Sequence, residues 1–339
     1  MRLILTAMLL TATSPLAAQV ASPDRPITDP RTVSSPENPA ARPVPLDDIG
    51  VTRALYDAVW SADGKRIFIA TDLTGRVNIW RMDANGSWPV QLTQSDDAQS
   101  GLAVSRDGQW LYFTQDAGGN EYYDVYRVSV DGGAVDNLTS TPDRSETGLL
   151  VAPAGDLVAL STKLKSEGQS NLAVMDASGK IRGLTAEKDP QYSWGAVAWV
   201  DGGKAIIANR ASVDGTVGEV WRIDAATGVA TKLLAKPGTI YAATGASPDG
   251  GTIAATTDEG TGQSHAGAYS VATKKWRWLP ATPWEETSDI MTPDGASMFV
   301  RTNNDGRSTL SRVDLATRKK TDLALDPGRA SVPGLTAIS

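Results

Sequence analysis

The chain of 339 residues contains no cysteine and a single histidine, His265. Without cysteine there can be no disulfide, no thiolate metal ligand and no cysteine nucleophile, so the core alone must stabilise the fold. One histidine leaves a single candidate for a general base or an imidazole ligand. On an extended chain its neighbour Ser264 points to the opposite face and cannot be its nucleophile. The sequence therefore predicts no catalytic residue, no metal site and no cofactor.

Basic residues are also in the minority, with 32 Lys and Arg against 39 Asp and Glu, a formal net charge of −7. No basic cluster stands out, so no nucleic-acid partner is expected. Two acidic loops, Thr93–Gln99 and Asn303–Arg307, contain oxygen ligands that calcium prefers. Neither has the spacing of a calcium-binding loop, so we interpret both as solvated turns.

Long apolar runs are absent except at the start, "MRLILTAMLLTATSPLAA". One Arg, an apolar run and then small residues are typical of a secretory signal peptide, here residues 1–21 with cleavage near Ala18 or Ala21. No cysteine follows for a lipid anchor, and no other run approaches the roughly 18 apolar residues of a spanning helix. We expect secretion across an inner membrane to the periplasm or beyond, with no membrane span.

Residues 22–45 carry seven of the 19 prolines and almost no large apolar side chain. This composition is typical of an extended linker and leaves residues 46–339 for the folded domain.

A segment of about 46 residues repeats six times through that domain. "VWSADGKRIFIAT" (Val59–Thr71) returns as "AVSRDGQWLYFTQ" (Ala103–Gln115) and, less closely, four more times. A turn glycine marks each copy, in four of them as part of an x-D-G turn, because a tight hairpin needs a positive φ. These glycines are spaced by 44, 47, 48, 47 and 45 residues: Gly64, Gly108, Gly155, Gly203, Gly250 and Gly295.

Each repeat also contains an alternating second strand, a third strand such as "NIWRMD" (Asn78–Asp83), and a short fourth strand that ends on Leu, often Leu-Thr. Four strands per repeat, with no helical period, predict an all-β protein. A β-propeller buries both faces of every sheet by radial stacking. We predict six complete four-stranded blades; a pair of β-sandwiches is the alternative.

The last residues, "GLTAIS" (Gly334–Ser339), resemble the first strand of a repeat, and Ser339 follows Thr292 by 47 residues. They predict the first strand of a seventh blade, and hence a propeller that is incomplete at its C-terminus. Such a ring would expose apolar blade faces and favour self-association.

The x-D-G turn, the "IWRMD"-like third strand and the "QLT" or "NLT" ending resemble the blades of two families. These are TolB-like periplasmic propellers and the N-terminal propellers of prolyl oligopeptidase-family serine peptidases, dipeptidyl-peptidase-like and acylaminoacyl-peptidase-like members included. The resemblance runs from about Asp47 to the end of the chain.

One longer stretch, "TQDAGGNEYYDVYRVSVDGG" (Thr114–Gly133), is similar to a loop and strand of these peptidases. The resemblance implies that Glu121, followed by Tyr122 and Tyr123, orients a peptide by its amino terminus. The alternative is a solvated loop charge beside two tyrosines that cover a blade edge.

In the peptidases an α/β-hydrolase domain follows the propeller and carries the catalytic triad. No G-x-S-x-G nucleophile elbow occurs in this chain, so we expect it to be inactive alone. The resemblance implies a propeller that gates substrate, with a peptide or a hydrolase domain as its partner. The alternative is a stand-alone TolB-like propeller that acts as a protein-binding scaffold.

Most of the ten tryptophans occupy repeated positions, such as Trp80 and Trp221 on third strands and Trp60 and Trp199 before hairpins, and so indicate blade packing. Three do not align between repeats and are the candidates for a partner surface: Trp88, Trp194 and Trp284.

Overall fold

The computed structural model describes residues 45–51, 53–304 and 307–324. The predicted signal peptide, almost all of the predicted linker and the segment Gly334–Ser339 lie outside these residues. The chain divides into two units, Met1–Val51 and Thr52–Ser339. In the first unit, a single helical turn, α1 (Leu46–Gly50), is described.

The second unit is built from short strands that follow one another in groups of four. The first three groups are β1 (Leu55–Trp60), β2 (Arg66–Thr71), β3 (Asn78–Asp83), β4 (Val90–Gln91); β5 (Gln99–Val104), β6 (Trp110–Gln115), β7 (Asp124–Ser129), β8 (Asp136–Asn137); and β9 (Arg144–Val151), β10 (Val158–Leu164), β11 (Asn171–Met175), β12 (Ile181–Gly183). The other three are β13 (Tyr192–Val200), β14 (Ala205–Ser212), β15 (Gly218–Asp224), β16 (Ala230–Leu234); β17 (Tyr241–Ala246), β18 (Thr252–Thr257), β19 (His265–Ser270), β20 (Lys275–Trp278); and β21 (Glu285–Met291), β22 (Ser297–Asn304), β23 (Arg307–Asp314), β24 (Lys320–Asp322). A 3₁₀ turn, Asp201–Gly203, lies between β13 and β14.

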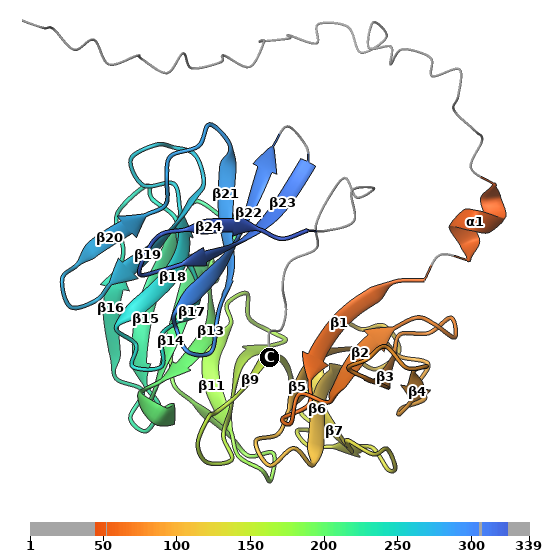
Figure 1. Cartoon of the computed structure of the whole chain (residues 1–339). Helices are drawn as coiled ribbons and strands as arrows, with labels where there is room; N and C mark the ends of the chain where they lie inside the picture. The colour runs from red at the N-terminus through yellow and green to blue at the C-terminus, as the bar shows by residue number, and fades with distance from the viewer. Residues whose placement is uncertain (1–44, 52, 305–306, 325–339) are drawn as a thin grey trace, which may run out of the picture. The chain divides into compact units, whose positions relative to one another are not determined.

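Each group forms one antiparallel sheet in which the strands are paired in chain order, and the sheets succeed one another as blades (Figure 1). This confirms the predicted all-β propeller with six four-stranded blades. The predicted third strand Asn78–Asp83 is β3 itself. The periodicity located these strands because each blade repeats the same alternation of buried and exposed side chains.

The repeated x-D-G turns owe their shape to a small hydrogen-bond network. In the first blade the Ser61 hydroxyl donates to Asp63 Oδ1 at 2.7 Å and accepts from the Arg66 amide at 2.9 Å. Gly64 follows with φ of +66°, a conformation that a side chain resists. The hydrogen bond from Ser61 holds the pKa of Asp63 below its usual value. The same arrangement recurs in three other blades, around Ser105, Ser247 and Thr292.

The Leu-Thr ending attaches the short fourth strand to the third. In the first blade the Leu92 amide donates to the Ile79 carbonyl at 2.8 Å, and the Thr93 hydroxyl accepts from the Ile79 amide at 3.0 Å. β4 contains only two residues, so these additional hydrogen bonds strengthen its attachment to β3. Equivalent bonds occur in the next two blades, at Leu138-Thr139 and Leu184-Thr185.

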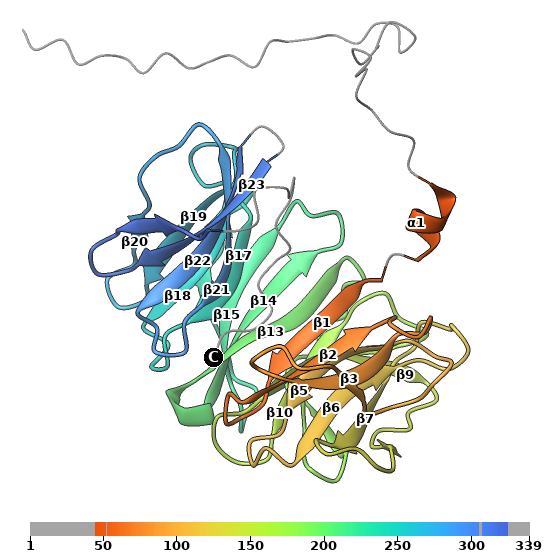
Figure 2. The ribbon, with the colours of Figure 1, turned by 45° about the vertical axis from the view of Figure 1, so that its right-hand side comes forward.

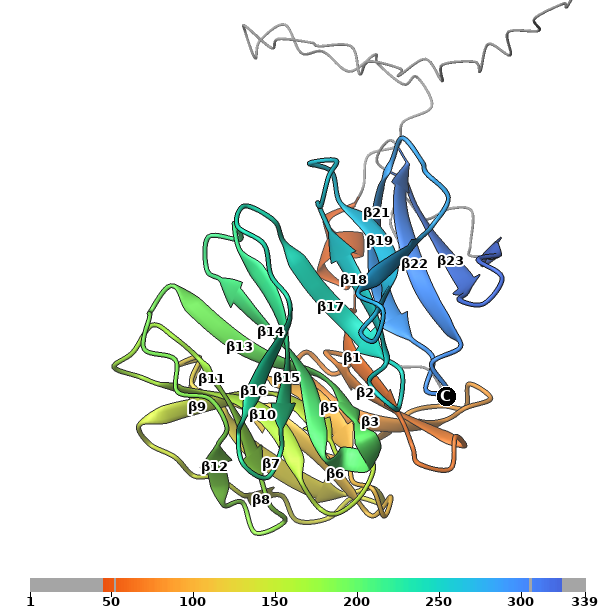
Figure 3. The ribbon, with the colours of Figure 1, turned by 90° about the vertical axis from the view of Figure 1, so that its left-hand side faces the viewer.

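The core consists mainly of five apolar clusters, each between one blade and the next, and a sixth small cluster around Phe299 and Leu310 lies within the sixth blade. Phe68 of the first blade packs with Leu111 and Phe113 of the second, and all three are fully buried. Figures 2 and 3 show the sheets side by side in chain order, which rules out the alternative of two β-sandwiches. Trp221 and Trp199 pack into one of these interfaces, which confirms their predicted packing role. Tyr126 and Tyr269 stand at the same third-strand position as Trp221 and pack into two others.

The first and sixth blades are the two ends of the series. Among residues 53–304 and 307–324, every substantial contact between strands of different blades joins consecutive blades, and none joins the first to the sixth. Within the same ranges and residues 45–51, no helix is long and apolar enough to span a bilayer.

Candidate functional site

The connections of the blades are divided between two ends. In an antiparallel meander, successive turns alternate between the two ends of the sheet. The x-D-G hairpins and the turns between third and fourth strands therefore lie at one end. The loops between second and third strands, and the links from one blade to the next, lie at the other, which we call the loop end. Glu121 and the surroundings of His265 both belong to it.

Glu121 lies in the loop between β6 and β7 in a left-handed conformation, with φ of +60°. Such a φ is uncommon for a residue with a side chain and is often found at functional sites. The Glu121 amide donates to the buried carboxylate of Asp116 at 2.9 Å, which holds the backbone in place. The Glu121 side chain is exposed and has no hydrogen bond or ion pair with another residue that the structure describes.

The two tyrosines after Glu121 fix this loop against the third blade. The Tyr122 ring, 37% exposed, has Lys165 Nζ 4.3 Å from its centroid. The Tyr123 amide donates to Ser145 Oγ at 3.0 Å, and its carbonyl accepts from the Glu146 amide at 2.7 Å. Burial raises the pKa of Tyr123. The three predicted residues thus lie together on an anchored loop; their role in orienting substrate stays a prediction.

A further set of residues, which sequence reasoning missed, caps the interfaces between blades. Each stands nine positions before a hairpin glycine, on the first strand of a blade, and is buried in every blade except the first. The first blade has Leu55, which is exposed, and the others are Gln99, Glu146, Trp194, Tyr241 and Glu286. The constant spacing was the available signal, but the differing side chains concealed it.

Glu146 is the most unusual of these residues because its carboxyl group is fully buried. Thr141 Oγ1 donates to Glu146 Oε2 at 2.9 Å, and Thr139 Oγ1 lies 3.2 Å from the same oxygen. Burial, assisted by the charge of Asp124, raises the pKa of Glu146 to about 7 although these hydroxyls oppose the shift. The second and third blades are therefore joined here by a carboxyl group that takes up a proton near neutral pH.

Trp194 belongs to the core rather than to the surface. It is 7% exposed, and its indole Nε1 donates to Glu187 Oε2 at 3.2 Å. Arg210 Nε donates to the same oxygen at 2.7 Å, and this bond lowers the pKa of Glu187 to about 2. Trp194 therefore offers no exposed face to a partner, whereas Trp88 and Trp284 are 83% and 38% exposed.

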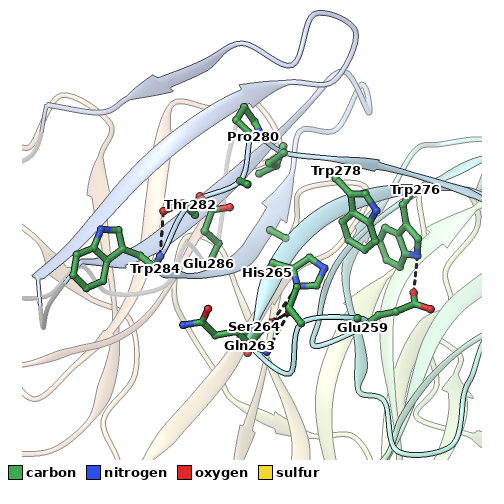
Figure 4. Close-up of a pocket in the computed structure, with 15 residues that line it drawn as sticks. Glu259, Gln263, Ser264, His265, Trp276, Trp278, Pro280, Thr282, Trp284 and Glu286 are labelled. Carbon is green, nitrogen blue, oxygen red and sulfur yellow. Dashed lines mark hydrogen bonds between the residues drawn. The ribbon is translucent and has the colours of Figure 1, made fainter. Parts of the chain in front are cut away.

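A pocket of about 630 Å³ opens at the loop end between the fifth and sixth blades. Figure 4 shows Trp276, Trp278 and His265 toward one side of the pocket, with Trp284 and Glu286 toward the other. The rings of Trp276 and Trp278 are stacked, with centroids 4.4 Å apart. Gly267 of the neighbouring strand permits this, because a Cβ there would stand 2.8 Å from the Trp278 ring.

The pocket lies beside the end of the fifth blade, where the Leu-Thr ending is altered. The fifth blade ends on Leu279-Pro280, so a proline replaces the threonine of the first three blades. In the second blade that threonine, Thr139, contacts the interface carboxyl group of Glu146. Pro280 has no hydroxyl to offer to Glu286, the corresponding carboxylate of the sixth blade. The link after Pro280 lines the pocket instead of filling it.

His265 is the first residue of β19, and its ring packs against Trp278 with centroids 4.5 Å apart. Its Nδ1 lies 3.0 Å from the Gln263 carbonyl and 3.3 Å from Thr261 Oγ1. These contacts hold the imidazole ring in the wall of the pocket. Among the residues that the structure describes, no three His, Asp or Glu side chains are grouped as metal ligands would be.

Comparisons with known proteins identify the fold. No family model matches the chain. An uncharacterized protein of Agrobacterium fabrum is 30% identical over 82 residues, which are 24% of this chain and 27% of that protein. TolB from Acinetobacter baumannii is similar in structure, with a TM-score of 0.53, 19% identity and coverage of 80% of this chain and 63% of TolB.

A prolyl endopeptidase, one of two studied for the role of inter-domain dynamics in catalysis and specificity, gives a TM-score of 0.65 at 13% identity. The match covers 82% of this chain and 43% of that enzyme. The chain thus spans less than two thirds of each of these three proteins. At these identities the two structural matches establish the propeller fold.

Proposed function

We propose that this chain is the substrate-gating propeller portion of an exported serine peptidase of the prolyl oligopeptidase type. Peptide hydrolysis would be carried by a C-terminal hydrolase domain. The similarity to a prolyl endopeptidase over 82% of the chain supports the assignment. Export to the periplasm or beyond is proposed from the apolar leader at residues 1–21.

The observation that carries this proposal is the position of Glu121. Its carboxylate is exposed at the loop end on a backbone that Asp116 holds in a left-handed conformation. An exposed carboxylate on an anchored backbone, with no cationic partner among the residues that the structure describes, suits the ammonium group at a peptide's amino terminus. Tyr122 and Tyr123 would flank the first residues of the bound peptide.

Titration calorimetry with a short peptide tests this role. A peptide with a free amino terminus should bind at least about tenfold more tightly than its acetylated form, because a charge-assisted hydrogen bond is lost on acetylation. Glu121→Gln should remove the difference between the two forms. Glu285→Gln, a change of another exposed carboxylate, is the control and should preserve it. Equal affinities of the unmodified chain for both peptides would overturn the role of Glu121.

The second candidate is a protein-binding scaffold like the TolB-like propellers. It is favoured by the outer edge of the first blade, where Trp88 and Val90 are 83% and 52% exposed. The two candidates differ in what the gene encodes after codon 339. A hydrolase-like reading frame with G-x-S-x-G supports the peptidase, and its absence supports the scaffold.

A further inference from the structure

The pocket between the fifth and sixth blades has an acidic lining. The charged side chains that line it are Glu259 and Glu286. Two lysines neutralise these carboxylates from outside the lining, with Lys236 Nζ 3.5 Å from Glu259 Oε1 and Lys320 Nζ 2.6 Å from Glu286 Oε1. No lysine or arginine is among the lining residues, His265 is the one basic side chain there, and the whole chain carries a net charge of −7. Because the two lysines compensate these carboxylates, a preference for a cation rests on the Glu286 oxygen that remains without a partner among the described residues and on the indole rings of the lining.

Glu286 supplies an acceptor to this lining. Its side chain is 4% exposed, and Oε1 accepts hydrogen bonds from Lys320 Nζ at 2.6 Å and from Thr302 Oγ1 at 3.3 Å. Oε2 accepts no hydrogen bond from any residue within 45–51, 53–304 or 307–324. This oxygen is not among the fully buried atoms, and Glu286 lines the pocket, so Oε2 can accept a hydrogen bond from a ligand there. A hydrogen-bond donor on a bound ligand would take the place of the threonine hydroxyl that is missing at Pro280. It would donate to Glu286 Oε2.

The aromatic side chains of the pocket indicate which kind of cation it would bind. Trp276 and Trp278 lie nearly parallel, at 14°, and Trp276 Nε1 donates to Glu259 Oε2 at 3.1 Å. Trp284, 38% exposed, stands across the pocket from them (Figure 4). Trp276 is also stacked on Tyr241, and His265 packs against Trp278, so Trp284 offers the indole face that no described ring covers. Indole faces attract cations, and a planar guanidinium stacks on them better than a compact ammonium does. A guanidinium can also donate to a carboxylate oxygen while it is stacked.

We propose that this pocket binds the arginine side chain of an extended peptide. The guanidinium would lie against the Trp284 indole and donate to Glu286 Oε2. The volume of about 630 Å³ falls in the usual range for ligand pockets, roughly 300–1,000 Å³, and leaves room for residues that flank the arginine. The link residues Pro280 and Ala281 would contact those neighbours. This site is separate from Glu121 and does not require a hydrolase domain.

The test is calorimetric titration of the purified chain with acetyl-Gly-Gly-Arg-Gly-Gly-amide and with the same peptide containing citrulline. Citrulline keeps the planar shape but removes the charge. Arginine should bind at least about tenfold more tightly. Acetylation removes the amino terminus, so the result is independent of the Glu121 proposal. Free arginine should bind more weakly than the peptide, and equal binding would contradict the assignment to a peptide.

Variants locate the site. Glu286→Gln should weaken binding of the arginine peptide about tenfold, whereas Glu285→Gln, at the exposed adjacent position, should leave it unchanged. Because Glu286 also pairs with Lys320, Trp284→Ala provides a second change at a half-exposed ring that should not disturb folding. It should weaken binding by a similar factor. Equal affinity for arginine and citrulline, no binding at all, or variants that bind like the unmodified chain would overturn the proposal.

Discussion

At the scale of single residues, the constant element of each blade interface is a position rather than a side-chain type. The residue nine positions before the hairpin glycine is Glu146 in one blade, Trp194 in the next and Glu286 in the last. These three residues interact differently at their interfaces. Glu146 is a protonatable carboxyl group, the Trp194 indole is hydrogen-bonded to Glu187, and Glu286 forms an ion pair with Lys320. These differences make the interfaces respond differently to pH and leave one of them with a pocket.

Glu146 makes stability depend on pH. Its pKa is about 7 in the folded chain against an ordinary value of 4.5. Between these values the folded state holds a proton that the unfolded state has released, so the free energy of unfolding decreases as pH rises. The decrease should approach about 3 kcal/mol by pH 8. Glu146→Gln should flatten this part of the profile, as measured by urea denaturation between pH 4.5 and 8.

Glu121→Gln is the matched control for that experiment, because Glu121 is exposed and its side chain has no hydrogen bond within the described part of the chain. It should retain the slope of the unmodified chain. An unchanged slope in Glu146→Gln would show that the carboxyl group is ionised in the folded state throughout this range.

At the scale of elements, the short fourth strands depend on the Leu-Thr ending. Thr185 Oγ1 accepts from the Leu172 amide at 2.9 Å and donates to Asn171 Oδ1 at 2.9 Å. Thr185→Val keeps the shape but leaves the partly buried amide without this acceptor, and should cost about 1–2 kcal/mol of unfolding free energy. Thr231→Val, on the exposed face of β16, should cost less than about 0.5 kcal/mol. Equal losses in a denaturant titration would contradict the capping role.

The blades could be predicted from the sequence, but the pocket could not. The x-D-G turn and the Leu-Thr ending are local, since Ser61, Asp63 and Gly64 make their bonds within one hairpin. Their spacing therefore located the strands. The pocket depends on two blades at once. The consequence of Pro280 appears only when the first strand of the next blade places Glu286 beside it, and no repeat within one blade indicates that contact.

The tryptophans also show what the repeat could not predict. Trp194 and Trp284 both fall outside the repeated tryptophan positions, yet one lies in the core and the other borders the pocket. Burial of Trp194 follows from its bond to Glu187 on the link from the previous blade. Glu187 precedes Trp194 by seven residues, and no other blade has the same two residues at this spacing.

At the scale of the whole molecule, the first blade presents an apolar face that no described blade covers. Phe68 and Ala70 pack toward the second blade, so the alternating residues Ile67 and Ile69 point to the opposite face. Leu55 is 62% exposed. We expect concentration-dependent self-association in sedimentation velocity, which Ile69→Lys should shift toward monomer. A chain that stays monomeric at all concentrations and melts sharply and reversibly would contradict this expectation.

The central claim is that this propeller binds peptide and leaves hydrolysis to another domain. The most direct measurement is a titration of the purified chain with a chromogenic dipeptide anilide that has a free amino terminus, with heat and absorbance recorded together. We predict a saturable heat of binding and no release of the chromophore. Release that a serine-directed phosphonate blocks, or the absence of any binding heat, would contradict the account.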